Sequence, residues 1–314
     1  MRSTVPLTVL AVLGLLSNPS AQADTFGSGA NTFTIDFVNI GNAGNAGDIP
    51  RPTTRYGAVL YEYRTGVFEI SQNDITRAVA NGLDNVTAGA WTGNRPAANI
   101  NWYEAAAFVN WLNISTGKQA AYNLSWNGTG WSMALWSTGN AWTVGGTNLF
   151  RHKNAHYFLP SENEWYKAAY YSPSGSNYFL YATGSDSSPT AVGNGTNSGT
   201  AVYDQLFRQG PASVGEAGGL SPYGTMGQNG NILEWTESNF VSPNNNPAGS
   251  RVLRGGQWSG GGIDISNRFT GGPADGLENV GFRVAAVPEP STYALLILAG
   301  AGAALIAKRR VGRE

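Results

Sequence analysis

Two nearby carboxylates, Glu162 and Glu164, are the first residues of this sequence whose types and spacing could do chemistry. Two carboxyl groups in different environments can act as a general acid and a general base. Both follow Ser161, however, and Glu164 stands three residues after that serine. A glutamate at this distance from a serine is typical of a capping box, which starts a helix. The spacing therefore favours a structural role over acid–base catalysis.

The only two histidines, His152 and His156, are candidate metal ligands. Their spacing of four would place both on one face of a helix, but residues 157–159 have the apolar character of a strand. Two imidazoles without a nearby carboxylate also make a poor iron site. We expect a pair of surface histidines, with metal binding as the alternative.

Four tryptophans at spacings of five, five and six residues form a third candidate, as a ligand-binding set: Trp126, Trp131, Trp136 and Trp142. They stand among Gly, Asn, Ser and Thr, which indicates short strands and turns. The indoles could simply fill the core of a β-rich region. They could instead form a stacking platform for sugar rings, because aromatic faces beside polar hydrogen-bonding groups suit a glycan. Both interpretations stay open.

The elements that position these candidates are expected to be short. Alternating apolar residues predict a half-buried strand at 33–38. A hairpin is expected next, with arms at 56–64 and 67–70 on either side of Thr65-Gly66. Three helices are expected to open with a small polar cap followed three positions later by an acid: Ser71 with Asp74, Asn101 with Glu104, and Ser161 with Glu164.

The two ends of the chain are expected to lie outside the fold. Residues 1–23 combine Arg2, an apolar run and Ala21-Gln22-Ala23, which is typical of a secretory signal peptide. At the other end, residues 288–291 read PEPS, and an apolar run at 293–307 precedes three basic residues. A helix over 291–307 would be about 25 Å long, slightly short of the ~30 Å hydrocarbon core but sufficient to span it, with the basic residues left in the cytoplasm.

The C-terminal segment, 288–314, resembles the PEP-CTERM sorting signal of Gram-negative bacteria. That resemblance implies recognition, and removal of the tail, by an exosortase. A plain membrane anchor at 291–307 is the alternative, and it gives the same orientation. In both cases the folded part works outside the cytoplasm, in the cell envelope or beyond it.

The core between these ends, residues 24–287, is expected to be one loop-rich domain. The chain has 42 Gly and no Cys. Without the five basic and two acidic residues of the ends, 14 basic and 18 acidic residues remain, a formal net charge of −4. Such a charge provides no positive field to hold nucleic acid, so we expect no nucleic-acid partner.

Five stretches of the core resemble the formylglycine-generating enzyme (sulfatase-modifying factor) family. Asn229-Gly230 predicts a tight type I′ turn within the first of them, because both central residues of such a turn need positive φ. The stretches are YGTMGQNGNILEW at 223–235, RVLRGGQW at 251–258, VGFRVA at 280–285, and the expected helices at 99–113 and 159–171. The resemblance implies the family's α+β, C-type-lectin-like fold, with short helices and small antiparallel sheets.

The resemblance also implies an activity that this sequence does not support. Enzymes of the family hold copper with a cysteine pair, and thiolate suits Cu(I). The first cysteine position falls on Ile265, or with one gap on Ser266, and the chain contains no cysteine. A second branch of the family holds iron with three histidines, and this chain has two. We therefore expect neither a copper nor an iron site, and no catalytic residue is assigned.

Calcium is the cofactor that the resemblance leaves open. Carried over by position, a Ca²⁺ ion would take the carbonyls of Gly230 and Ile232 and the carboxylate of Glu234. Gly227 stands where the family has a side-chain ligand, so water or another loop would have to complete the six to eight oxygens that calcium prefers. The alternative is that Glu234 pairs with a buried arginine, either Arg254 or Arg283.

The sequence thus predicts an exported, non-catalytic binding or structural domain. Its expected partners are the sorting machinery and either an envelope polysaccharide or another surface protein. A domain that only supports the surface matrix, with no specific ligand, is a further possibility. An oxidase or oxygenase of the same family with an unfamiliar metal site is the alternative from a different class.

Overall fold

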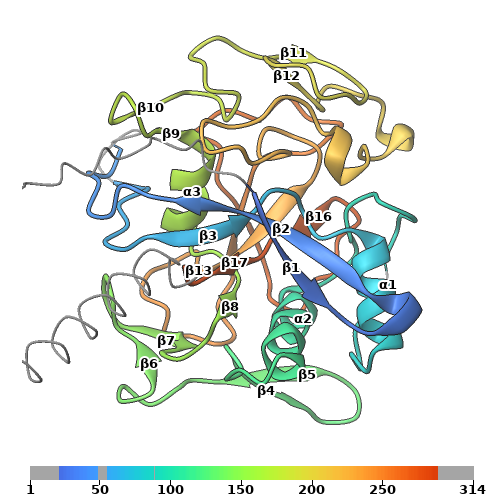
Figure 1. The fold of residues 1–314 in the computed structure, drawn as a ribbon, viewed down its shortest axis with the longest axis vertical. Helices are drawn as coiled ribbons and strands as arrows, with labels where there is room; N and C mark the ends of the chain where they lie inside the picture. The colour runs from blue at the N-terminus through green and yellow to red at the C-terminus, as the bar shows by residue number, and fades with distance from the viewer. Residues whose placement is uncertain (1–20, 49–54, 88, 289–314) are drawn as a thin grey trace, which may run out of the picture.

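The computed structural model describes residues 21–48, 55–87 and 89–288 (Figure 1). Most of the expected signal peptide at 1–23 and the expected membrane helix at 291–307 lie outside these ranges. Among the described residues, no helix has the length and apolar character required to cross a bilayer. The fold is α+β and loop-rich, as the sequence predicts, with short helices packed beside several small sheets (Figure 1).

Three α-helices form where the capping residues predict them. They are α1 (Gln72–Ala80), α2 (Trp102–Ser115) and α3 (Glu162–Tyr170). In each, the cap side chain accepts from a backbone N–H while the acid three residues later accepts from the N–H of the cap, so all three capping boxes are confirmed. Three single-turn 3₁₀ helices are also present: η1 (Gly29–Asn31), η2 (Phe207–Gln209) and η3 (Val214–Glu216).

A five-stranded antiparallel sheet joins the beginning and the end of the domain. Its order is β1-β2-β3-β17-β8. The strands are β1 (Gln22–Phe26), β2 (Phe33–Ile40), β3 (Tyr63–Gly66), β17 (Ala285–Ala286) and β8 (Tyr157–Phe158). The alternation predicted at 33–38 is confirmed, because Phe33, Ile35 and Phe37 of β2 are all buried.

The hairpin expected across Thr65-Gly66 is wrong. Both residues lie inside β3, where Thr65 is paired with Val38 on one side and with Ala285 on the other. The backbone stays extended through this dipeptide because β17, 220 residues further along the chain, provides a second pairing edge. A local turn signal could not reveal that partner.

A four-stranded sheet, in the order β15-β14-β13-β16, forms the second layer. Its strands are β13 (Leu233–Asn239), β14 (Arg251–Arg254), β15 (Phe269–Gly271) and β16 (Val280–Phe282). Four two-stranded sheets complete the fold: β4 (Asn123–Trp126) with β5 (Trp131–Ala134), β6 (Ala141–Trp142) with β7 (Asn148–His152), β9 (Tyr171–Ser172) with β10 (Asn177–Tyr178), and β11 (Thr190–Ala191) with β12 (Thr200–Ala201).

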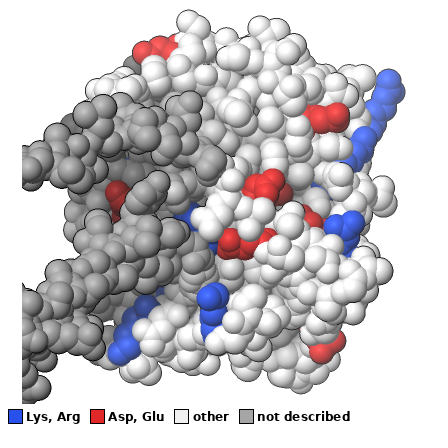
Figure 2. Space-filling model, in the orientation of Figure 1, with Lys and Arg blue, Asp and Glu red and all other residues white. Residues whose placement is uncertain are grey.

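The interior contains large aromatic side chains together with arginines. The largest fully buried side chains include four tryptophans and five arginines: Trp102, Trp165, Trp235, Trp258, Arg64, Arg151, Arg251, Arg254 and Arg283. The outer surface, by contrast, carries few charges, and Figure 2 shows Lys, Arg, Asp and Glu scattered in small groups over one face. Many of the charged side chains of this protein are therefore buried in its interior.

Arg64 ties the two ends of the described domain together. Its Nη1 and Nη2 donate to Asp24 at 2.9 and 2.8 Å, and its Nε donates to the carbonyl of Val287 at 3.3 Å. Tyr157 also donates to Asp24, at 2.9 Å. Asp24 is the first residue after the expected signal peptide, and Val287 is the last before the expected sorting segment. The guanidinium of Arg64 therefore binds a residue at each boundary of the domain.

We expect replacement of Asp24 by Asn to destabilise the domain. The substitution removes a bidentate ion pair from a buried guanidinium, and hydrogen bonds to charged groups contribute about 1.5–3 kcal/mol each. Chemical denaturation of wild type and D24N measures the loss. The matched control is Asp84→Asn, which changes an exposed aspartate. Equal stability of D24N and D84N would show that the Arg64 pair contributes little.

Candidate functional site

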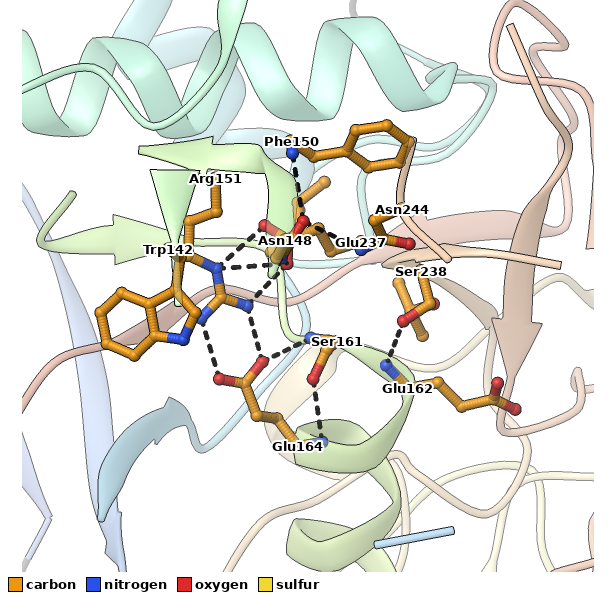
Figure 3. A network of polar contacts seen from close by, with 12 residues as sticks. Trp142, Asn148, Phe150, Arg151, Ser161, Glu162, Glu164, Glu237, Ser238 and Asn244 are labelled. Carbon is orange, nitrogen blue, oxygen red and sulfur yellow. Dashed lines mark hydrogen bonds and ion pairs between the residues drawn. The ribbon is translucent and has the colours of Figure 1, made fainter. Parts of the chain in front are cut away.

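An open groove of about 930 Å³ lies at the N-terminus of α3. The segment 55–61, the strands β6 and β7, the end of β13 with the loop after it, and Arg268 form its walls. Trp142 and Tyr61 contribute aromatic surface, with ring centroids 5.1 Å apart. Figure 3 shows the polar side chains that lie around the groove and beneath it.

The floor of the groove is built on Arg151, which lies between two buried carboxylates (Figure 3). Its Nη1 and Nη2 donate to Glu164 at 3.0 and 2.8 Å, and its Nε and Nη2 donate to Glu237 at 3.0 and 2.7 Å. Asn148 donates to Glu237 as well, and Tyr61 to Glu164. Residues from β7, α3 and β13 are therefore locked together under the groove.

The two carboxylates differ in electrostatic environment. Burial raises the pKa of Glu164, but the charge and hydrogen bonds of Arg151 outweigh that effect, so its pKa lies below the usual value. Burial also raises the pKa of Glu237, and there the opposing effect of Arg151 is not sufficient to cancel it. Glu164 is thus held ionised as the partner of Arg151 and as part of the capping box of α3.

Glu162 forms a separate ion cluster in the groove wall. It accepts from Nε of Arg254 at 2.9 Å, and from Nε and Nη2 of Arg268 at 2.8 and 3.0 Å. Figure 3 shows its carboxylate pointing away from that of Glu164. The two glutamates therefore do not face a common space, and the structural interpretation of this pair holds.

Trp142 is the one tryptophan of the predicted binding set that lines the groove. Its ring lies beside the guanidinium of Arg151, whose Cζ is 5.4 Å from the ring centroid. Its Nε1 donates to the carbonyl of Val144 at 2.9 Å, which fixes the ring. An anchored, partly exposed indole of this kind can contact a ligand without first having to be ordered.

The other three tryptophans lie elsewhere. Trp126 and Trp131 face each other across β4 and β5, with ring centroids 5.4 Å apart. Trp136 donates to the carbonyl of Ala121 at 2.9 Å and contacts the ring of His152. The four indoles thus do not form one continuous platform, because they belong to two separate small sheets and the connection between them.

The histidines also differ from the expectation. His152 is the last residue of β7 and is 7% exposed, so it is not a surface residue. His156 contacts the guanidinium of Arg64, with 3.3 Å between the two nitrogens. A turn separates the two residues, and the helix that would bring them together does not form. Among the described residues, no group of three or more His, Cys, Asp or Glu is placed to hold a metal ion.

The two positions aligned with the family's copper-binding cysteine have ordinary structural roles. Ile265 is buried in a cluster with Trp165, Tyr166 and Tyr170. Ser266 is exposed and donates to the side chain of Asp264. Neither position offers a soft ligand for copper.

The turn before β13 is shifted by one residue from its predicted position. Positive φ occurs at Gly230 and Asn231, with values of 98° and 55°. A Cβ at Gly230 would lie 2.2 Å from the carbonyl oxygen of Val202, so only glycine fits there. The side chain of Asn231 explains the shift, because it donates to Glu69 at 2.9 Å and accepts from the N–H of Ala212.

Glu234, the candidate calcium ligand, forms a bidentate ion pair with Arg283. Nη2 and Nε of Arg283 each donate to one of its carboxylate oxygens at 2.6 Å, and Trp165 donates at 2.7 Å. Arg254 pairs instead with Glu162. The guanidinium of Arg283 already occupies the position beside the Glu234 carboxylate where a calcium ion would bind, so this donor set does not fit calcium well. Calcium at Gly230, Ile232 and Glu234 stays a prediction.

Glu69, which the sequence analysis did not single out, lies beside this pair. Its Oε2 is buried and has no hydrogen-bond partner among the residues that the structure describes. Burial raises its pKa to about 7, with Arg283 opposing the shift and Glu234 adding to it. Glu69 stands in FEISQ at 68–72, a further stretch that resembles a motif of the family, YEVTN, and this resemblance is the signal in the sequence that could have found it.

We expect the stability of the protein to fall as pH rises from about 4.5 to about 7, in part through Glu69. The folded chain holds this proton more tightly than the unfolded chain, so raising pH favours unfolding, by at most about 3 kcal/mol for this shift. Thermal melts across this pH range should show a smaller pH effect in Glu69→Gln than in wild type. Glu278→Gln, at an exposed site, is the control. Parallel profiles for all three proteins would contradict the prediction.

Thermal melts with added Ca²⁺ and with a chelator test the turn at Glu234. Because Arg283 occupies the carboxylate, we expect the two melting temperatures to agree. A chelator-sensitive melt that becomes insensitive in Glu234→Gln would instead establish calcium at this turn.

Comparison with known proteins places these features in a family. The Sulfatase-modifying factor enzyme 1-like domain matches residues 61–287, and the PEP-CTERM protein-sorting motif matches residues 286–311. The motif marks the chain as an exported, envelope-associated protein that exosortase-type sorting machinery recognises. No curated protein matches the chain.

Several solved structures share the fold at low sequence identity. Treponema denticola variable protein 1 is 22% identical with a TM-score of 0.58, and the match covers 85% of this chain and 99% of that protein's chain. CarF is 20% identical with a TM-score of 0.53, covering 81% and 99%. PvdO from Pseudomonas aeruginosa is 13% identical with a TM-score of 0.56, covering 84% and 98%. These likenesses show the α+β, C-type-lectin-like fold, and the match over residues 61–287 shows that the chain belongs to the sulfatase-modifying factor enzyme 1-like family.

Proposed function

We propose that this exported domain is a non-catalytic module that binds a polysaccharide of the cell envelope in the groove at the N-terminus of α3. The observation that carries the proposal is the composition of the groove, where the aromatic surfaces of Trp142 and Tyr61 lie among amide and hydroxyl side chains. Sugar rings present apolar faces and a rim of hydroxyl groups, which such a surface complements.

The size and openness of the groove suit a chain-like ligand. Its volume of about 930 Å³ is at the upper end of the range for small-molecule sites. Its polar lining includes Asn148, Asn163 and Asn244. Asn148 and Asn244 are hydrogen-bonded to each other, with 3.1 Å between Nδ2 of Asn244 and Oδ1 of Asn148, so their orientation is fixed before a ligand binds.

The charged groups of the groove support a binding role over a catalytic one. Glu162, Glu164 and Glu237 all accept from arginine side chains, so their carboxylates are engaged in ion pairs within the protein. The position that aligns with the family's first copper-binding cysteine holds Ile265 or, with one gap, Ser266, and the chain contains no cysteine. The framework of the family is kept, while the residues of its known redox chemistry are replaced.

We expect the purified chain to bind polysaccharides saturably, and Trp142→Ala to weaken that binding about tenfold or more, as loss of a central aromatic contact does. Titration of a panel of neutral and acidic polysaccharides, with thermal melts to confirm folding, measures the effect. Trp126→Ala is the control, since Trp126 is 39% exposed on a different sheet.

Equal losses in the two variants would contradict the placement of the site. Turnover of a peptide or small molecule, or stoichiometric copper or iron in the purified protein, would overturn the proposal in favour of a metal-dependent oxidase or oxygenase of this family.

A further inference from the structure

We propose that the polysaccharide bound by this groove is acidic, and that Arg268 and Arg55 bind its anionic groups. This inference rests on the proposed function and adds to it the chemical class of the ligand. It follows from which hydrogen-bonding groups of the groove are already used by the protein and which are left for a ligand.

Arg268 has one unused end. Its Nε and Nη2 bind Glu162, and Nη2 also donates to the carbonyl of Phe240 at 3.0 Å. Nη1 donates to no residue that the structure describes, and the side chain is 21% exposed in the groove wall. A guanidinium fixed at one end and open at the other presents two N–H donors to a ligand.

The orientation of Arg268 is fixed before a ligand arrives. Its Cζ lies 4.1 Å from the centroid of the Phe240 ring, so the guanidinium is stacked as well as hydrogen-bonded. Arginine combines stacking and planar hydrogen bonding in this way, and little further ordering is needed when an anion binds.

The ion cluster around Glu162 has more positive than negative charge. One carboxylate is shared by two guanidinium groups, those of Arg254 and Arg268. Arg254 is buried and saturated, because its remaining Nη1 donates to the carbonyls of Ile265 and Asn267. The surplus charge is therefore presented to the groove by Arg268, the more exposed of the two.

Arg55 adds a second cation at the same groove. It is exposed, and among the described residues no carboxylate lies within ion-pair distance of it. Its backbone immediately precedes Tyr56, whose ring lies 5.9 Å from the Cζ of Arg268. Two guanidinium groups on one groove suit successive acidic units of a polymer.

Asn163 adds a further donor to this wall. Asn163 accepts from the N–H of Gly57 through Oδ1, which leaves its Nδ2 available to a ligand. The nearby carboxylates of Glu164 and Glu237 are fully buried and engaged by Arg151, Tyr61 and Asn148, so a ligand does not contact them. A surface that offers donors and cations selects a ligand rich in acceptors and negative charge.

The test is titration of the full chain, purified in mild detergent, with three polymers: polygalacturonate, dextran sulfate and uncharged dextran. We expect at least tenfold tighter binding of one or both acidic polymers than of dextran, weakened by added salt. Arg268→Gln and Arg55→Gln should each weaken that binding about tenfold, and dextran binding should not change. Preference for the carboxylated or the sulfated polymer identifies the anion.

Two features keep the result interpretable. Arg55 makes no ion pair with described residues, so R55Q is expected to fold normally even if R268Q disturbs the cluster at Glu162. Arg208→Gln, at an exposed arginine outside the groove, controls for loss of one positive charge. Equal binding of dextran and the acidic polymers, or equal affinities of R55Q, R268Q and R208Q, would overturn this inference.

The same titrations separate the inference from the function on which it rests. Binding of dextran that is lost in Trp142→Ala but unchanged in R55Q and R268Q would uphold polysaccharide binding and refute the acidic ligand. Absence of binding to all three polymers would refute this inference and count against the proposed function.

Discussion

Buried ion pairs between arginine and carboxylate are the interaction on which this structure depends. Glu234 with Arg283, Arg151 with Glu164 and Glu237, and Arg254 with Glu162 each connect elements far apart in the sequence. The chain has no cysteine, so no disulfide can make these connections. A buried pair adds little net stability compared with a well-packed apolar contact, but loss of one partner costs about 3–5 kcal/mol. Such pairs therefore specify one arrangement of loops that have little regular secondary structure of their own.

The same ion pairs shape the groove. Arg151 fixes β7 against α3 and β13 in the floor, and Glu162 fixes Arg254 and Arg268 in the wall. Because the carboxylates of Glu162, Glu164 and Glu237 are matched by arginines, the groups left for a ligand are those that the fold does not use. The stability of the loops and the chemistry of the groove thus have one physical origin.

This arrangement is also independent of the position that aligns with the family's first copper-binding cysteine. Ile265 occupies its position by packing against Trp165 and Tyr166, and Ser266 by hydrogen bonding to Asp264. Neither side chain takes part in the ion pairs that hold the loops, although the backbone carbonyl of Ile265 accepts from Arg254. A change at these positions can therefore alter the chemistry of the site and leave the scaffold intact.

Features encoded within a few residues could be predicted from the sequence. The capping boxes at Ser71, Asn101 and Ser161 formed as expected, because cap and acid lie on the same helical turn. The alternation in β2 and the family motifs, which indicate the fold class, could be recognised for the same reason, because each lies within a short stretch of sequence. The sorting segment at the C-terminus could also be recognised, through the resemblance of its PEPS motif, apolar run and basic residues to the PEP-CTERM signal.

Features that depend on distant partners were decided only by the tertiary structure. Thr65-Gly66 lies inside a strand because β17 pairs with it from the far end of the domain. Trp142 lines the groove while Trp126, Trp131 and Trp136 lie elsewhere, although similar spacings separate all four. The roles of Arg268 and Glu69 depend on which neighbours use their hydrogen-bonding groups. A sequence specifies local hydrogen bonds directly, but which charges are matched and which remain free depends on segments that meet only when the whole chain has folded.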